Sequence, residues 1–427
     1  MGKRGWLNLT FGEICLSLLT GGTPDTSIAK YWSGSVPWIT GADFLNQKIA
    51  EPRRYITEEA VHRSNTRIIK AGNLLVVTRT GVGKIAIAPF DIAVSQDTTG
   101  VYFHENISVD FMFYCIQSQI EELKKLNQGT SINGILKADL LALALTIPES
   151  FAEQQKIAEI LSTIDRAIEQ TEAIIAKQQR IKTGLMQDLL TKGIDEDGNV
   201  RSEATHKFKD SPLGRIPVEW EVEKFDSLLI EKRYGISTSL SEDPIGIPVL
   251  RMNNLVKGEI DFTDLKYSER EDARKLTLDD GDVLFNRTNS IDYVGRTAIY
   301  RYSGKPVSFA SYLVRLVPDN ARLCPEYLNL CLNDGENQIR VKQFATIGVQ
   351  QANVNPTNLG TLLLAIPQKI TEQKQIIEDI SASIDCQRDT NTNLRKLQSL
   401  KIGLMQDLLT GNVRVTALLN DQEIAKI

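Results

Sequence analysis

The longest regular pattern of apolar and polar positions in this chain follows Pro148. Apolar residues recur there every three or four positions, with Glu, Gln, Lys and Arg between them, at Ile157, Ile160, Leu161, Ile164, Ile168, Ile174, Ile175, Ile181 and Leu185. A similar stretch follows Pro367, and neither stretch contains proline, or glycine before Gly184 and Gly403. This spacing predicts two long helices. Each would have about forty residues and a length of roughly 60 Å.

A helix of that length cannot bury its apolar stripe against one small domain. If the two stripes pack against each other as a coiled coil, both are buried. Each predicted helix follows the same kind of globular region. The sequence therefore favours an antiparallel pair, with the globular regions at opposite ends.

The globular regions alternate short apolar runs with glycine and asparagine turns. β-branched and aromatic residues dominate the runs LLVVTR, KIAIAP, VLFNRT and SYLVRLV, which predicts strands. The segment DFMFYCIQSQIEELKKL from Asp110 has helical spacing instead. The predicted fold class is α/β, with two mixed α/β domains joined by two long antiparallel helices. Before Trp220, a stretch rich in Gly, Pro and acidic residues predicts a linker or arm.

The same segments occur twice at a constant distance. The octapeptide GLMQDLLT stands at 184–191 and again 219 positions later at 403–410, and the same offset relates Leu140 to Leu359 and Ile147 to Ile366. A shared offset at independent places indicates an internal duplication. The sequence then divides into a first domain at 1–148, a first long helix at 149–192, a linker arm and second domain at 193–366, and a second long helix with a C-terminal tail at 367–427.

Composition places the chain among globular proteins, with 42% hydrophobic and 24% charged residues. The most apolar stretch, Ile135 to Pro148, is broken by Lys137 and Asp139, so we expect no membrane span. Glu13 precedes any apolar signal segment, so we expect a cytoplasmic protein. The three histidines are isolated and the five cysteines lack CxxC spacing. These features argue against a histidine-built metal site and against redox chemistry.

Two short motifs suggest chemistry but have simpler structural interpretations. Gly81 to Lys84 partly matches a phosphate-binding loop, yet no Ser or Thr follows Lys84, so a tight turn between strands is favoured. Asn355 to Asn358 partly matches the tetrad with which adenine methyltransferases hold a flipped base, but lacks its second proline and its aromatic residue. A turn at a helix start is favoured there. Since no triad or paired-carboxylate motif stands out either, the chain is predicted to be non-catalytic and to use no cofactor.

The net charge of −5 argues mildly against a nucleic-acid partner, but the distribution of charge along the chain does not. Between Lys48 and Phe90, eight basic residues stand against three acidic ones. Between Arg287 and Arg315, five basic residues stand against one acidic residue. Each predicted domain therefore carries its own basic stretch.

The repeated octapeptide also contains an identical polar pair, Gln187-Asp188 in the first copy and Gln406-Asp407 in the second. Its apolar residues can be identical because they pack alike. The polar pair can instead present one surface to two copies of the same partner. Ordinary helix-surface propensity is the alternative explanation.

The order of these parts resembles the specificity subunit of type I restriction-modification systems. The resemblance covers nearly the whole chain and rests on GGTPDTSIAKYWSGSVPWITGADF, on PLGRIPVEWEVEKF, on the G-[ND]-[LV]-L stretches leading to Arg79 and Arg287, and on the IPES…EQ and IPQK…EQ entries to the helices. It implies two target-recognition domains that each read half of an interrupted double-stranded DNA sequence, with the helices setting the gap. It also implies two methyltransferase subunits docked on this frame, and restriction/translocase subunits that complete the enzyme.

In such a protein the basic stretches would contact phosphates, while base edges carry the sequence information. Arg suits guanine, and Asn or Gln suits adenine. The candidate DNA-binding residues are Arg53, Arg54, Arg63, Arg67, Arg79, Thr80, Lys84 and Gln96 in the first domain, and Asn286, Arg287, Asn289, Arg296 and Tyr312 in the second. Two alternatives stay open. One is a self-sufficient DNA methyltransferase or nuclease, which the missing cofactor loop opposes, and the other is a coiled-coil adaptor that does not bind DNA.

Overall fold

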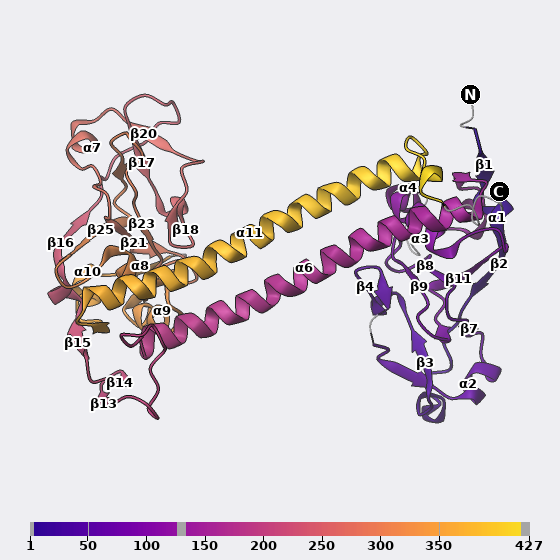
Figure 1. Cartoon of the computed structure of the whole chain (residues 1–427), viewed down its shortest axis with the longest axis horizontal. Helices are drawn as coiled ribbons and strands as arrows, with labels where there is room; N and C mark the ends of the chain where they lie inside the picture. The colour runs from indigo at the N-terminus through magenta and orange to yellow at the C-terminus, as the bar shows by residue number, and fades with distance from the viewer. Residues whose placement is uncertain (1–3, 50, 126–133, 350, 420–427) are drawn as a thin grey trace. The chain divides into compact units, whose positions relative to one another are not determined.

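Figure 1 shows the computed structural model, which describes residues 4–49, 51–125, 134–349 and 351–419. The chain forms two compact units. Unit 1 contains residues 1–173 and 392–427, and unit 2 contains residues 174–391. The two long helices are α6 (Phe151–Thr191) and α11 (Ile370–Leu409). Each unit therefore combines a globular part with half of each long helix, so the unit boundaries fall inside the helices.

Unit 1 contains two four-stranded sheets. One has the order β2 (Cys15–Thr20), β11 (Thr98–Phe103), β8 (Leu74–Val77), β9 (Ile85–Ile87). The other has the order β6 (Arg54–Ile56), β3 (Val36–Ile39), β10 (Ile92–Val94), β7 (Arg67–Ile69). The first strand of the unit, β1 (Trp6–Thr10), pairs with β12 (Ala144–Pro148), which leads into α6. The smaller elements are α1 (Phe11–Ile14), η1 (Ala29–Trp32), η2 (Gly41–Asp43), β4 (Phe44–Leu45), β5 (Lys48–Ile49), α2 (Glu58–Arg63), α3 (Val109–Ser118), α4 (Ile120–Lys125), α5 (Lys137–Leu141) and η5 (Thr416–Leu418).

Unit 2 repeats this plan. Its four-stranded sheet has the order β16 (Leu229–Tyr234), β25 (Leu313–Pro318), β21 (Val283–Asn286), β23 (Thr297–Ile299), and a second sheet has the order β20 (Lys266–Ser268), β17 (Ile247–Leu250), β24 (Ser308–Phe309). Strand β15 (Trp220–Lys224) pairs with β28 (Leu363–Pro367), which leads into α11. The smaller elements are β13 (Phe208–Ser211), β14 (Gly214–Pro217), η3 (Phe225–Leu228), η4 (Met252–Asn254), β18 (Leu255–Val256), β19 (Glu259–Ile260), α7 (Glu271–Lys275), β22 (Thr288–Asn289), α8 (Pro325–Asn333), α9 (Gly335–Gln343), β26 (Ala345–Ile347), β27 (Ala352–Val354) and α10 (Pro356–Leu359).

Equivalent strands of the two units pair in the same register. The facing residues are Pro37 and Tyr55 in unit 1 and Pro248 and Tyr267 in unit 2, and likewise Trp6 and Pro148, then Trp220 and Pro367. The internal repeat read from the sequence is therefore present in the backbone. The predicted strands are also confirmed, because the four apolar runs form β8, β9, β21 and β25.

The predicted linker before Trp220 is more structured than the sequence suggested. It contains the hairpin formed by β13 and β14, in which Phe208 faces Pro217. Gly214 takes a φ of 92° at the turn, a conformation that favours glycine. In the described parts of the chain, no helix has both the length and the apolar content that crossing a membrane requires.

A buried ion pair fixes the start of α11 in unit 2. Both carboxylate oxygens of Glu372 accept hydrogen bonds from the Arg201 guanidinium, and one of them also accepts from Trp220 Nε1 at 3.0 Å. Arg201 lies just beyond the end of α6, and both paired side chains are only 8% exposed. Gly193 has a φ of 62°, and a Cβ there would lie 2.6 Å from the Trp220 ring. We call Glu372, Arg201 and Trp220 the unit 2 clamp.

Unit 1 has a similar arrangement at the start of α6, although Trp6 Nε1, unlike Trp220 Nε1, donates no hydrogen bond to the glutamate. Glu153 accepts hydrogen bonds from Arg414 Nε at 2.6 Å and Nη2 at 2.7 Å. Arg414 lies beyond the end of α11, and it also donates to the carbonyl oxygen of Arg4 at 2.6 Å. Gly411 has a φ of 67°, and a Cβ there would lie 2.8 Å from the Trp6 ring. We call Glu153, Arg414 and Trp6 the unit 1 clamp. In each unit, the clamp therefore joins the start of one long helix to the residues that follow the other.

The glutamine after each clamp glutamate has an equally specific role. Gln154 accepts from the backbone N–H of Ser108 at 2.8 Å and donates to the carbonyl oxygen of Pro148 at 2.9 Å. Gln373 accepts from the backbone N–H of Cys324 at 2.8 Å and donates to Pro367 at 3.0 Å. Both glutamines are buried. The repeated Glu-Gln pair is thus explained by burial and hydrogen bonding within the fold.

The apolar residues of the two octapeptides occupy matching positions. In unit 1, Leu404, Met405, Leu408 and Leu409 pack against the core that contains Ile157 and Leu161. In unit 2, Leu185, Met186, Leu189 and Leu190 pack against the core that contains Ile376 and Ile380. The two helices also contact each other through polar groups, with Lys401 paired to Asp165 at 2.7 Å and Gln178 donating to Thr390 at 3.0 Å. The long helices therefore pack together within each unit.

Replacing Glu372 with Gln should leave the buried Arg201 charge without its carboxylate. Breaking a buried pair in this way costs about 3–5 kcal/mol. We expect faster amide hydrogen exchange in unit 2 than in the wild type. The matched control is Glu153→Gln, for which we expect a smaller effect in unit 1, because Arg414 is 35% exposed and water can replace part of the lost interaction. Equal protection of unit 2 in the wild type and in Glu372→Gln would contradict this account of the clamp.

Candidate nucleic-acid interface

The basic candidates of unit 1 lie along one sheet and its connections. Arg54 begins β6, Arg63 ends α2 and Arg67 begins β7. All three side chains are exposed, as is Arg53 just before β6. The sheet that contains β6, β3, β10 and β7, together with its connecting segments, therefore carries most of the positive charge predicted for this domain.

Arg53 is held by a buried carboxylate. Asp43 closes the capping box of η2, accepting from the backbone N–H and the hydroxyl of Thr40 at 2.8 and 3.0 Å, and it accepts from Arg53 Nε at 2.7 Å. Burial alone would raise the pKa of Asp43, but the hydrogen bonds from Arg53 and Thr40 outweigh burial and hold this pKa below its ordinary value. Asp43 therefore fixes Arg53 at the surface while neutralising part of its charge.

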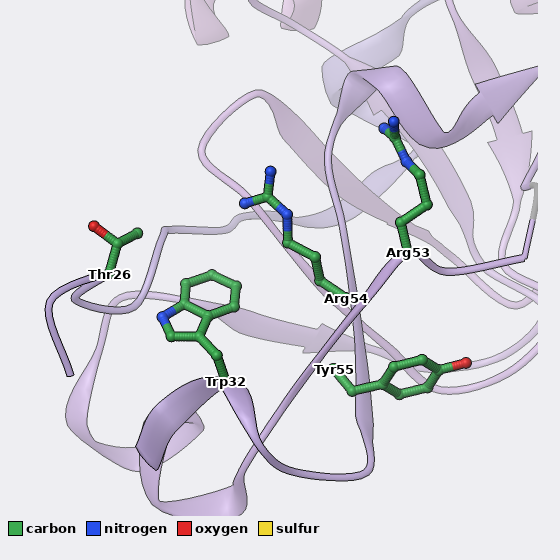
Figure 2. Close-up of a pocket in the computed structure, with 5 residues that line it drawn as sticks. All are labelled: Thr26, Trp32, Arg53, Arg54 and Tyr55. Carbon is green, nitrogen blue, oxygen red and sulfur yellow. The ribbon is translucent and has the colours of Figure 1, made fainter. Parts of the chain in front are cut away.

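Arg54 lies instead against two tryptophan rings. Its guanidinium carbon is 5.8 Å from the centroid of Trp32 and 5.5 Å from that of Trp38. Figure 2 shows Arg53, Arg54, Trp32, Tyr55 and Thr26 around one hollow, whose volume is about 460 Å³. A hollow of this size is within the range of ligand pockets.

The turn between β8 and β9 carries three further candidates. Gly81 and Gly83 have φ values of 91° and 96°, which confirms a tight turn in place of a phosphate-binding loop. Arg79 and Thr80 are exposed beside it. Lys84 is half-buried, and its Nζ donates to the carbonyl oxygen of Gly41 at 2.8 Å. The ammonium of Lys84 therefore supports the fold as well.

Gln96 lies on the loop before β11. It is exposed, and its side-chain oxygen accepts from the Thr23 hydroxyl at 2.5 Å. This bond leaves the amide nitrogen of Gln96 as a donor on the surface of unit 1.

The candidates of unit 2 differ in accessibility. Asn286 is 1% exposed, and its amide nitrogen donates to the carbonyl oxygen of Tyr293 at 3.3 Å. Its side chain is therefore part of the interior of unit 2. Asn289 is half-buried in β22, and its side-chain oxygen accepts from the backbone N–H of Ser290 at 2.8 Å.

Arg287 lies against an aromatic ring. Its guanidinium carbon lies 5.1 Å from the centroid of Tyr234, and its Nη1 donates to the carbonyl oxygen of Ser311 at 3.1 Å. The backbone N–H of Arg287 donates to Tyr312, whose side chain is 46% exposed. Arg287 and Tyr234 therefore form a cationic and aromatic pair, and Tyr312 contacts Arg287 through its backbone.

Arg296 forms a second pair of this kind in unit 2. Its guanidinium carbon lies 4.1 Å from the ring centroid of Tyr293, and the Tyr293 side chain is exposed. Aromatic contact restrains a guanidinium while leaving its N–H donors available.

Arg79 and Arg287 do not occupy equivalent positions, although similar sequence leads to both. The backbone N–H of Arg287 donates to Tyr312, and its carbonyl oxygen accepts from Val354. In unit 1 the matching residue is Thr78. Its backbone N–H donates to the carbonyl oxygen of Asp97, and its carbonyl oxygen accepts from the backbone N–H of Ile135. Arg79 therefore corresponds to Thr288, one position further on.

The polar pairs at the helix ends are accessible. Gln187, Gln406 and Asp407 are exposed, and Asp188 is half-buried and pairs with Lys192 at 2.7 Å. The second octapeptide also lines a hollow of about 590 Å³ in unit 1, together with residues of β1, α3 and β12. The helix end therefore combines an exposed polar pair with a hollow.

The sequence interpretation missed the aromatic partners of the arginines, namely Trp32 and Trp38 for Arg54, Tyr234 for Arg287 and Tyr293 for Arg296. For Arg54 the signal was available as aromatic residues close to basic ones, in AKYW, VPW and RRY. Most of these contacts join different strands or loops, so their pairing became visible only with the register of the sheets.

Comparison with known proteins agrees with the duplicated architecture. The sequence model of the family described as "Type I restriction modification DNA specificity domain" matches the chain twice, at residues 3–178 and 217–400. These matches cover most of the chain, one in each half. The chain belongs to this family.

Related proteins carry the same description. The chain is 32% identical over 225 residues to the putative type I restriction enzyme MjaX specificity subunit of Methanocaldococcus jannaschii, and this match spans 52% of each protein. It is 23% identical over 419 residues to the MjaVIII specificity subunit of the same organism, covering 96% of the chain and 93% of that relative. The chain thus spans about half the length of the first of these relatives and nearly all of the second.

A solved structure supports the fold. The crystal structure of the S subunit of a type I restriction-modification system from M. genitalium matches with a TM-score of 0.57 at 14% sequence identity. The match covers 94% of this chain and 96% of that one. At this identity the likeness supports the arrangement of the elements.

Replacing Asp43 with Asn should lower the free energy of unfolding of unit 1 by about 1–3 kcal/mol at neutral pH, because buried hydrogen bonds lose their charged acceptor. The folded pKa lies below the ordinary value of 3.8. The stabilisation is therefore complete above pH 3.8 and is lost as the pH falls through the folded pKa. Urea unfolding followed by tryptophan fluorescence tests this, since three of the four tryptophans lie in unit 1.

The matched control for this substitution is Asp91→Asn, because Asp91 pairs with Lys70 at an exposed site. Exposed pairs contribute little to stability, so we expect almost no change at neutral pH. If Asp43→Asn and Asp91→Asn were equally stable at all pH values, Asp43 would have no special role in holding Arg53.

Proposed function

We propose that this chain is the DNA-recognition subunit of a type I restriction-modification complex, and that the catalytic work belongs to its partner subunits. The observation that carries the proposal is one structural frame built twice with different surface residues. The two clamps use the same residue types in both units. By contrast, the arginines with aromatic partners stand at different positions of the shared fold. A common frame with two different reading surfaces suits a target of two unlike half-sites.

In this proposal each unit reads one half-site of double-stranded DNA. Exposed basic side chains contact phosphates and fix the position of the unit, and a smaller set contacts base edges. The exposed candidates are Arg53, Arg54, Arg63, Arg67, Arg79, Thr80 and Gln96 in unit 1 and Tyr312 in unit 2, and the half-buried candidates are Lys84, Arg287, Asn289 and Arg296. Asn286 would act indirectly, by supporting the loop that contains Tyr293.

Partner subunits would dock on the helix ends. Two methyltransferase subunits would contact the matching pairs Gln187-Asp188 and Gln406-Asp407, and restriction/translocase subunits would join the complex. The exposure of these pairs and the hollow beside Gln406 support this assignment. The net charge of −5 also favours DNA binding within a complex, where other subunits add contacts.

The long helices would act as an antiparallel coiled coil that sets the gap between the half-sites. Binding of one unit to its half-site would raise the effective concentration of the other unit at its own half-site. The four sequence segments, 1–148, 149–192, 193–366 and 367–427, would then serve as first reader, first spacer, second reader and second spacer.

The test is methylation mapping of host DNA with and without this chain, in cells that contain the partner subunits. We expect methylation at one interrupted sequence only when the chain is present. The purified complex should also shift this duplex in a salt-sensitive manner. Methyl transfer by the chain alone would favour a self-sufficient enzyme. If the chain changed neither the methylation pattern nor the binding of the duplex, an adaptor that does not bind DNA would be favoured.

Insertion of seven residues after Ala173 in α6, together with seven after Asn391 in α11, should preserve both clamps while lengthening each helix by about 10 Å. At 3.4 Å per base pair, the gap in the target should grow by about three base pairs. The two half-site sequences should not change. Methylation mapping of the double insertion checks both expectations. A single insertion, in α6 alone, is the control, because it shifts one helix against the other and should impair recognition.

A further inference from the structure

We infer that Arg54 is a base-reading residue, which recognises a guanine in the half-site bound by unit 1. This inference rests on the proposed function and makes it more specific. Arg54 differs from other basic residues of unit 1 in its environment. Aromatic rings lie against Arg54, whereas carboxylates pair with several of the other basic residues. The argument depends on three features: the restraint on its guanidinium, the freedom of its donors, and the residue that replaces it in unit 2.

The restraint comes from both the backbone and the rings. Arg54 faces Trp38 across the antiparallel pair β3 and β6. Trp38 is buried, and its Nε1 donates to the carbonyl oxygen of Gly22 at 3.2 Å. Trp32 packs edge-on against Trp38, with ring centroids 5.1 Å apart. The guanidinium of Arg54 therefore lies against two rings that are themselves fixed, and less side-chain freedom is lost when it binds.

The donors of Arg54 are free for a ligand. In the described part of the chain, no carboxylate pairs with Arg54, whereas the adjacent Arg53 donates to Asp43. The guanidinium carries its N–H groups in a planar fork, and this fork matches the O6 and N7 acceptors of guanine in the major groove. A phosphate contact needs only charge. Base reading also requires that the donors point in a fixed direction. The guanidinium of Arg54 meets this requirement, because the rings restrain it and its N–H donors are unused.

The hollow beside Arg54 suits a base edge better than a base inserted between rings. Both tryptophans are already engaged, Trp38 with Trp32 and with Arg54, and Trp32 Nε1 with the carbonyl oxygen of Asp25 at 3.2 Å. An extrahelical base would have to displace the guanidinium before it could stack on the face of Trp32 that Arg54 covers. As Figure 2 shows, Arg54 and Trp32 face the same space, with Thr26 beyond Trp32, while the ring of Tyr55 points away from it.

The repeat shows what the same position contains in unit 2. Across β17 and β20, the residue that faces Val249 is Lys266, which occupies the place of Arg54, while Val249 occupies the place of Trp38. Lys266 forms an ion pair with Glu242. Unit 2 therefore has neither the ring nor the free fork at this site. A guanine contact made by Arg54 would belong to one half-site only, as two unlike half-sites require.

The test uses the complex assembled with its methyltransferase subunits and a set of duplexes in which each base pair of the target is changed in turn. We expect the wild type to prefer guanine at one position of the first half-site by about 5- to 150-fold. Arg54→Gln should lose this preference and Arg54→Lys should weaken it, because neither side chain offers the planar fork. Preferences at all other positions should persist. The matched control, Lys266→Gln, should leave every preference in place.

Three outcomes would overturn the inference. If Arg54→Lys keeps the full preference, the planar fork is not what reads the base. If Arg54→Gln weakens binding equally for all duplexes and reduces the salt dependence, Arg54 contacts a phosphate. If both variants match the wild type, Arg54 does not touch the DNA. Amide hydrogen exchange of unit 1 would show that each variant is folded. Failure of the proposed function is distinguishable, because the wild-type complex itself would then show no sequence preference.

Discussion

The structure of each unit depends on one constraint: a buried glutamate carboxylate must have a cationic partner. Glu153 and Glu372 lie in the first turns of α6 and α11, and each is buried with an arginine supplied from beyond the end of the other helix. Separating the helices would leave a charge buried without its partner, which is strongly unfavourable. Each unit is therefore complete only when both long helices contribute to it. The same requirement explains the glycines at 193 and 411, whose positive φ values let the chain pass closely over Trp220 and Trp6.

This arrangement separates the constant parts of the protein from the variable ones. The clamps, the buried glutamines and the apolar residues of the octapeptides are matched in both units because they fill matched spaces. The edges and strand ends of the sheets carry no such constraint. Arg54 with its tryptophans and Arg287 with its tyrosine therefore stand at different places on a common scaffold. A protein built in this way can change what each unit binds without changing how the frame is held.

The sequence predicted those features that depend on periodicity and repetition. The long helices followed from apolar spacing and the repeat from a constant offset. The clamps did not follow, because Arg201 and Arg414 are 213 positions apart, outside the common offset of 219. The segments after the two helices differ in length, so alignment could not pair these arginines. Asn286 looked like a surface residue by type, yet the pairing of β21 with β25 places it inside. Contacts between distant segments, such as Arg54 with Trp32, depend on strand register that local sequence does not encode.

The most direct test is a chain with two copies of the first reader. Residues 221–384 would be replaced by residues 7–165, which keeps Trp220, Arg201 and the end of α6 while supplying the equivalent glutamate from the first copy. Methylation mapping with the partner subunits then measures the target. If the clamps form a common frame for independent readers, the target becomes two copies of the first half-site. If this chain instead retains the original second half-site, the specificity does not reside in the exchanged units, and the account is contradicted.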